Sequence, residues 1–496
     1  MATQGIENRF RLPRIEGDVA LFRDDQGRIL LTGAPTLDFE GLVRGKGGLD
    51  ASMRTQHVSA DSGIAHALAS MEAWEAAGQL PVAENGRALR GVLHTASLLH
   101  AHLRHFYIQL LPDYLPEATL LDYTGGHTAL NRIRKAVSGR GKGHWTRHGF
   151  EHPFTLPEIN LLWEHRAQAM EALGLLQRMM AVIGGKFPMA MSIVPGGVNL
   201  LLSESRILQL RRLLEILRLE LTDTPMADGE LLVKRHPVLA GLGEGGLSLL
   251  SAGSGEDESV LDGGLFPSGI LLEGKLEPYS ALSTESIDRA FYSISPTGEG
   301  GGRPVSDPDK PGAYSWVKAP RYQGLVLEAG PIARMAIAYL SGERLWDPKL
   351  VERVESLLRR PLARANTVGG RILARMGETG GLLSLIESQL DQLDPGQPSV
   401  STEQGSGRFS GEGTGTLEAP AGTLSHRTVV DKGRIAYYDI VTPNTWNGSP
   451  QDQNGRSGAL ETALNRSNHD LDDPAQRRLL SRIVQSFAFS MRDAVH

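Results

Sequence analysis

The 496-residue sequence contains no cysteine. This absence excludes disulfides, thiolate-bound metals, iron–sulfur clusters ligated by the chain itself, and cysteine nucleophiles. The sequence also lacks any apolar run close to the roughly 20 residues that cross a bilayer, so no direct membrane insertion is expected. The first residues are polar and do not resemble a signal peptide, which makes the cytoplasm the default location.

A strong charge of either sign is also missing. The formal net charge is −6, with 22% charged and 40% hydrophobic residues, as in an ordinary globular protein. We therefore expect no nucleic-acid partner and no attraction to an anionic membrane surface. The length alone allows the mass of two to four domains.

Apolar residues at helical spacing dominate what is present. The pattern begins with Ile64, Leu68, Met71 and Trp74 and recurs along the chain. It predicts helices over residues 62–77, 89–110, 157–183, 203–221, 331–341, 348–358 and 369–392. A last helix should begin at Pro474 with Asp473 as its cap.

Strands are expected to be fewer and shorter. Turn residues at 24–27 and 431–433 predict hairpins near residues 14–31 and 428–441. Residues 223–315 are rich in Gly, Ser, Asp and Pro, which indicates short strands and long surface loops. Residues 394–416 have almost no apolar side chains, so we interpret them as a flexible Gly/Ser-rich loop. The expected fold class is mainly α with small β lobes (α+β).

The end of the chain carries a distinctive pattern. Residues 486–496 read Ser-Phe-Ala-Phe-Ser-Met-Arg-Asp-Ala-Val-His. This segment resembles the end of nickel–iron hydrogenase large subunits, Asp-Pro-Cys-x-x-Cys-x-x-His, with Ser490 and Asp493 at the cysteine positions. Further tracts resemble the same family in the same order, at residues 14–17, 55–70, 99–107, 184–188, 194–198, 314–322, 328–334 and 443–450.

The resemblance covers nearly the whole chain and implies one domain, residues 1–496, with the long central helix bundle of the hydrogenase large-subunit fold. It also places the metal-ligand positions of the family on Ser59, Ser62, Ser490 and Asp493. Nickel and low-spin iron need soft thiolates, whereas hydroxyl and carboxylate oxygens suit Mg, Ca or Mn. We therefore expect no nickel–iron cofactor. The alternative hypothesis is that the four residues bind no metal and are plain polar side chains that fill the vacated pocket.

Groups around the family's metal site are changed as well. An arginine and two aspartates of the family fall on Ala421, Ala101 and Ala488. Glu16, by contrast, matches the family's proton-relay glutamate, and Glu40 and His496 match two ligands of a structural magnesium site. Magnesium is thus a possible cofactor. His66 is also kept, and a single histidine on a helix face is most simply a hydrogen-bonded core residue.

For function, the resemblance implies binding rather than catalysis. The first hypothesis is a non-catalytic scaffold subunit, inactive as a hydrogenase, paired with an iron–sulfur small-subunit-like partner in a redox complex. Such a partner could also carry the chain to a membrane or export it. The alternatives are a repurposed enzyme whose vacated pocket binds another metal or a small molecule, and a hydrogenase maturation factor.

Overall fold

The computed structural model describes residues 9–33, 37–138, 153–253, 266–279, 284–286, 289–294, 304–342, 348–402 and 408–494. A large cluster of buried apolar side chains runs through them, from Leu12 to Ala494. Within these ranges, no helix has both the length and the apolar character needed to cross a membrane.

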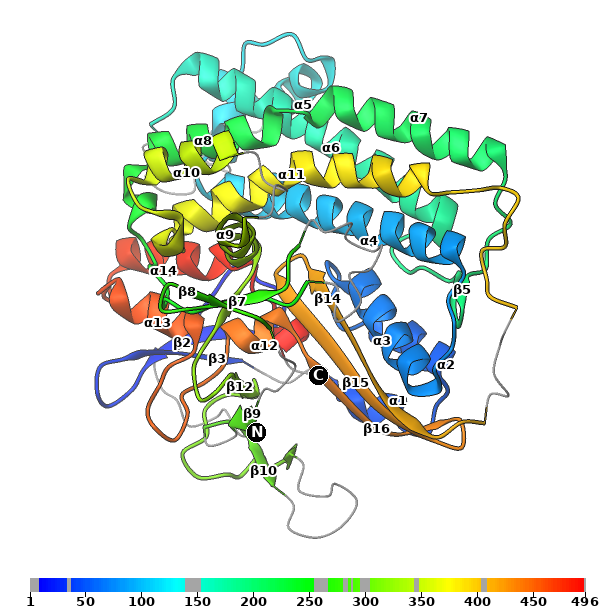
Figure 1. The fold of residues 1–496 in the computed structure, drawn as a ribbon. Helices are drawn as coiled ribbons and strands as arrows, with labels where there is room; N and C mark the ends of the chain where they lie inside the picture. Colours follow the sequence, from blue (N-terminus) through cyan, green and yellow to red (C-terminus); the bar gives the residue numbers. More distant parts are fainter. Residues whose placement is uncertain are drawn as a thin grey trace.

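Long helices packed side by side form the centre of the fold (Figure 1). They are α4 (Glu84–Arg104), α6 (Leu156–Gly184), α7 (Glu204–Leu221) and α11 (Val368–Asp391). The caps of α6 follow from its sequence: Thr155 and Glu158 form a capping box, and Gly185 ends the helix at φ 81°. These elements confirm the helices predicted over 89–110, 157–183, 203–221 and 369–392, although the last turn of the first is a π-helix, His105–Leu110.

Shorter helices surround this centre. In chain order they are α1 (Phe39–Val43), α2 (Gly48–Thr55), α3 (Gly63–Gly78), α5 (Thr128–Ser138), α8 (Thr224–Arg235), α9 (Pro331–Ser341), α10 (Pro348–Leu358), α12 (Pro443–Asn447), α13 (Ala459–Arg466), α14 (Pro474–Ser486) and α15 (Met491–Ala494). The Asp473 side chain caps α14 by accepting a hydrogen bond from Ala475 N, as predicted.

The strands form small separate sheets. An antiparallel sheet holds β1 (Phe10–Arg11), β2 (Val19–Arg23) and β3 (Ile29–Gly33). A second, ordered β13-β6-β7-β8, joins β6 (Leu249–Ser251), β7 (Gly269–Leu272), β8 (Lys275–Glu277) and β13 (Glu328–Ala329), with β13 parallel to β6. The two-stranded sheets pair β4 (Ile193–Val194) with β5 (Gly197–Val198), β9 (Thr284–Ser286) with β12 (Ala319–Arg321), and β10 (Tyr292–Ile294) with β11 (Pro304–Ser306).

The longest strands form the antiparallel sheet β14-β15-β16, which lies beside α3 (Figure 1). They are β14 (Gly411–Ala419), β15 (Gly422–Asp431) and β16 (Arg434–Val441). The turn between β15 and β16 falls at Lys432 and Gly433, both with positive φ, as the sequence predicts.

Part of the segment interpreted as a flexible loop is strand β14 (Gly411–Ala419). Its alternate glycines, Gly411, Gly413 and Gly415, face α3 at close range, and a Cβ on Gly413 would lie 2.3 Å from the Ala73 carbonyl oxygen. Two residues of a strand span about 6.6 Å, and four residues of a helix span about 6 Å. Glycines at every second position of β14 therefore lie beside carbonyl oxygens at every fourth position of α3. Residues 403–407 of the predicted loop lie outside the described residues.

The middle of the chain, expected to hold strands and loops, also contains helix α8 (Thr224–Arg235). Asp228 lies on its inward face and breaks the apolar pattern. Its carboxylate is buried and accepts hydrogen bonds from Tyr107 OH, at 2.6 Å, and His165 Nδ1, at 2.8 Å. From the sequence alone, a buried aspartate with internal partners looks the same as an aspartate on the surface, so the inward face of α8 is not recognised.

Candidate functional site

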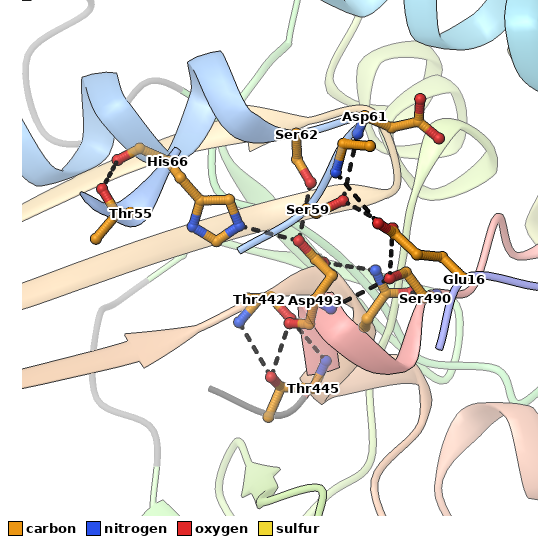
Figure 2. A network of polar contacts seen from close by, with 12 residues as sticks. Glu16, Thr55, Ser59, Asp61, Ser62, His66, Thr442, Thr445, Ser490 and Asp493 are labelled. Atoms are coloured by element: carbon orange, nitrogen blue, oxygen red, sulfur yellow. Dashed lines mark hydrogen bonds and ion pairs between the residues drawn. The ribbon is translucent and has the colours of Figure 1, made fainter. Parts of the chain in front are cut away.

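Ser59 and Ser490, far apart in the chain, meet at Glu16 (Figure 2). The Glu16 Oε2 atom accepts hydrogen bonds from Ser490 Oγ, at 2.8 Å, and from Ser59 Oγ, at 3.2 Å. The backbone holds this arrangement in place, because Met491 N donates to the Glu16 carbonyl oxygen at 2.9 Å. The N-terminal segment and the end of the described chain are thus joined at one carboxylate.

Asp493, in α15, is the centre of a second cluster beside the first (Figure 2). Its Oδ1 accepts hydrogen bonds from Ser62 Oγ (2.8 Å) and His66 Nε2 (2.9 Å), and its Oδ2 accepts one from Asn444 Nδ2 (2.5 Å). Burial alone would raise the pKa of Asp493, but the hydrogen bonds and charge of His66, with help from Asn444 and Ser62, lower it below the usual value. Asp493 is therefore an ionised carboxylate held by hydrogen-bond donors from within the protein.

His66 continues this cluster into the core. Its Nδ1 lies 2.9 Å from His426 Nε2, and His426 Nδ1 lies 2.7 Å from Tyr438 OH. The contacts therefore form a continuous chain from Tyr438 through His426 and His66 to Asp493. His66 is fully buried and hydrogen-bonded on both nitrogens, which matches its interpretation as a core residue.

A small pocket opens next to Glu16, and Ala101, Ala421 and Ala488 all line it together with Ser490. Its volume of about 40 Å³ admits roughly three water molecules. The structure therefore brings together the serines, Asp493, Glu16 and the three alanines that the sequence singled out.

Glu40 lies apart from this pocket and is held by a lysine. Its Oε1 accepts hydrogen bonds from Lys318 Nζ (2.7 Å) and Ile440 N (2.9 Å), and Lys318 Nζ also lies 2.7 Å from Asp439 Oδ1. Burial raises the pKa of Glu40 to about 8, with Lys318 opposing and Asp439 adding to the rise. His496, the other expected magnesium ligand, lies outside the described residues. No three His, Cys, Asp or Glu side chains in the described ranges are grouped to hold a metal, so magnesium stays a prediction.

Comparison with known proteins decides the family. The family model described as nickel-dependent hydrogenase matches residues 38–496. The chain belongs to the nickel-dependent hydrogenase family. It is 26% identical to the hydrogenase-2 large chain of Escherichia coli, covering 97% of this chain and 95% of that one. It is 27% identical to the periplasmic [NiFeSe] hydrogenase large subunit of Desulfomicrobium baculatum, over 98% and 93% of the two chains.

The fold of this hydrogenase-family chain agrees with that result. The Ni-Fe-Se hydrogenase structure from D. vulgaris Hildenborough superposes with a TM-score of 0.83 and 25% identity, covering 99% of both chains. The H2-activated [NiFeSe] hydrogenase of Dm. baculatum gives a TM-score of 0.81 over 99% of both chains. The predicted hydrogenase large-subunit fold is confirmed.

The side chains at the expected ligand positions do not fit a nickel–iron group. Such a group needs thiolates, and these positions supply three hydroxyls and one carboxylate. Each of the four already has an internal hydrogen bond, to Glu16 for Ser59 and Ser490, and between Ser62 and Asp493. We therefore assign no step of hydrogen activation to these residues.

Sequence reasoning missed several members of the site. Asn444 lies within the tract at 443–450 and Lys318 within that at 314–322, so the tracts identified the segments but not these roles. Arg375, on α11, lines the pocket and was not singled out at all. Its position in a helix rich in apolar residues gives no sign that it faces a cavity.

Proposed function

We propose that this chain is a binding subunit of a redox complex, paired with an iron–sulfur small-subunit-like partner, and that it does not itself activate hydrogen. One observation carries the proposal. The large-subunit fold is retained over 99% of the chain, yet hydroxyl and carboxylate groups that are already hydrogen-bonded within the protein stand where thiolates are needed. The simplest reason to retain this fold without the metal ligands is that its surface binds a partner.

The relatives are named large chains and large subunits, which supports the inference that this chain is also one part of an assembly. Exposed leucines in the N-terminal segment support it further. Leu37, Leu42 and Leu49, in and beside α1 and α2, expose 55, 42 and 41% of their surface. We infer that these side chains belong to the surface that the partner covers. We infer that the cellular location of the chain follows that partner.

Copurification tests the proposal. The tagged chain is purified anaerobically from its native host, and the eluate is examined for a stoichiometric second subunit with iron–sulfur absorbance. The double variant Leu42→Asp, Leu49→Asp should lose this partner, because two buried charges at an interface each cost several kcal/mol.

A matched control is available on α7, where Leu219 is 87% exposed. Leu219→Asp introduces the same change far along the chain and should retain the partner. A chain that elutes alone in every preparation, or a double variant that keeps its partner, would contradict the proposal.

A further inference from the structure

Arg375 is a buried cation in the wall of the pocket that Ala101 and Ala488 also line. Arg375 is only 2% exposed. Its Nε atom has no hydrogen-bond partner, and within the described ranges no carboxylate lies within ion-pair distance of it. A buried arginine is normally paired, because an uncompensated charge is costly to remove from water.

The acidic groups nearest to Arg375 are already bound to other cations. Glu378, one turn further along α11, accepts two hydrogen bonds of 2.7 Å from Arg334 and one of 2.6 Å from His102. Asp61 is bound by Arg104 at 2.6 Å. Burial lowers the pKa of Arg375 to about 10, which still leaves the guanidinium protonated at pH 7.

The pocket is built to take a small group beside this charge. Its alanines leave about 40 Å³, room for an anion of three or four non-hydrogen atoms. Gln485 also lines it, and its Oε1, a buried acceptor without a partner in the described part of the chain, can accept a hydrogen bond from an anion that carries a hydroxyl, as bicarbonate does. The Glu16 carboxylate, which lines the same pocket, disfavours a second negative charge, so a monovalent ligand fits better than a divalent phosphate or sulfate.

His105 adds no compensating charge. It lines the same pocket and its Nε2 donates to the Gln485 carbonyl oxygen at 2.7 Å. Burial and the charge of Arg375 hold the pKa of His105 well below its usual range, so the ring is neutral at pH 7. Arg14 and Asp61 line the pocket too, but Arg14 is paired with Asp113 and Asp61 with Arg104. Within the described ranges, Arg375 is thus the lining cation that has no hydrogen-bonded carboxylate.

We propose that the pocket is a binding site for a small monovalent carboxylate or bicarbonate, held by the Arg375 guanidinium where Ala101 and Ala488 leave space. The planar guanidinium matches a planar carboxylate with two parallel hydrogen bonds. This inference goes beyond the partner proposal and does not depend on it.

Formate is the probe. Isothermal titration of the full-length chain with sodium formate, at constant ionic strength maintained with sodium chloride, should show saturable 1:1 binding in the millimolar range, as expected for so small a ligand. Arg375→Gln should weaken binding by more than about tenfold, because the ion pair is lost.

A second pair of variants keeps the test decisive if Arg375→Gln fails to fold. Ala101→Asp places a carboxylate on the pocket wall, where it should pair with Arg375 and abolish formate binding. Ala101→Asn has nearly the same volume without the charge and should retain more binding than Ala101→Asp. No saturable binding to the wild type, or equal binding to the Asp and Asn variants, would overturn the proposal.

Discussion

Nε2 of His66 lies 2.9 Å from Oδ1 of Asp493, and this contact ties α3 to α15, 427 residues later in the sequence. The carboxylate receives further hydrogen bonds from Ser62 and Asn444. An anion therefore occupies one of the positions at which the family resemblance places a metal-bound thiolate. Both of its carboxylate oxygens accept hydrogen bonds from groups of the chain itself.

Replacing Asp493 should destabilise the fold. Asp493→Ala leaves His66, Ser62 and Asn444 without their acceptor, and should reduce the free energy of unfolding by about 3–5 kcal/mol. Asp493→Asn keeps the shape and should cost about 1–3 kcal/mol. Urea denaturation at pH 7 measures both, with Asp25→Asn, an exposed aspartate, as the control expected to match wild type.

The same carboxylate predicts an acid dependence. Because the pKa of Asp493 in the folded state lies below the ordinary value for an aspartate, its contribution to stability is present above about pH 4 and is lost as the pH falls through the folded-state pKa. Asp493→Asn should therefore lose less stability than wild type on acidification. Parallel pH profiles for the two proteins would show that the carboxylate is not stabilised as described.

Glu461 predicts the opposite pH dependence. It is fully buried, and burial raises its pKa to about 8, so the folded state binds a proton that the unfolded state releases above about pH 4.5. Stability should then fall between about pH 4.5 and 8, by up to roughly 1.4 kcal/mol per pH unit from this group. Glu461→Gln keeps an acceptor oxygen for Leu31 N and Tyr314 OH and removes the titrating carboxyl group.

The measurement is the free energy of unfolding from pH 5 to pH 8. Glu461→Gln should be close to wild type at pH 5 and clearly more stable at pH 8. Glu215→Gln, at an exposed position of α7, should follow the wild-type slope. A slope unchanged by Glu461→Gln would mean that Glu461 is ionised in the folded protein.

Gly413 should tolerate no side chain. Its Cβ would lie 2.3 Å from both Ala73 O and Ala77 N on α3, so Gly413→Ala must push the strand from the helix and should cost about 1–3 kcal/mol. Gly380→Ala on α11 is the control, because nothing lies within 4 Å of that Cβ and alanine favours a helix. Thermal denaturation should separate the two, and equal melting temperatures would refute the close packing of β14 on α3.

The sequence predicted the helices because their apolar spacing and caps are local properties. Asp473, which caps the start of α14, and Gly185, which ends α6, are both adjacent in sequence to the helix that they delimit. It also identified Ser59, Ser62, Ser490 and Asp493 as one group, because the family resemblance relates segments far apart in the chain.

The rest depends on contacts between distant segments. The glycines of β14 resemble a linker by composition, and only the carbonyls of α3 beside them explain why they are glycines. Arg375 lies in a helix whose other arginine, Arg371, has a carboxylate partner, Glu328. That Arg375 alone of these two faces a pocket lined by alanines is a property of three-dimensional packing.

The most direct test of the central claim is the metal content of the full-length chain, measured by inductively coupled plasma mass spectrometry after anaerobic purification from its native host and separation from any partner. We expect far less than one nickel per chain, no iron in proportion to nickel, and no bound metal other than magnesium. Zinc or manganese at one per chain would favour the repurposed-enzyme alternative. Stoichiometric nickel together with iron would contradict the account, since ligands would then have to come from outside this chain.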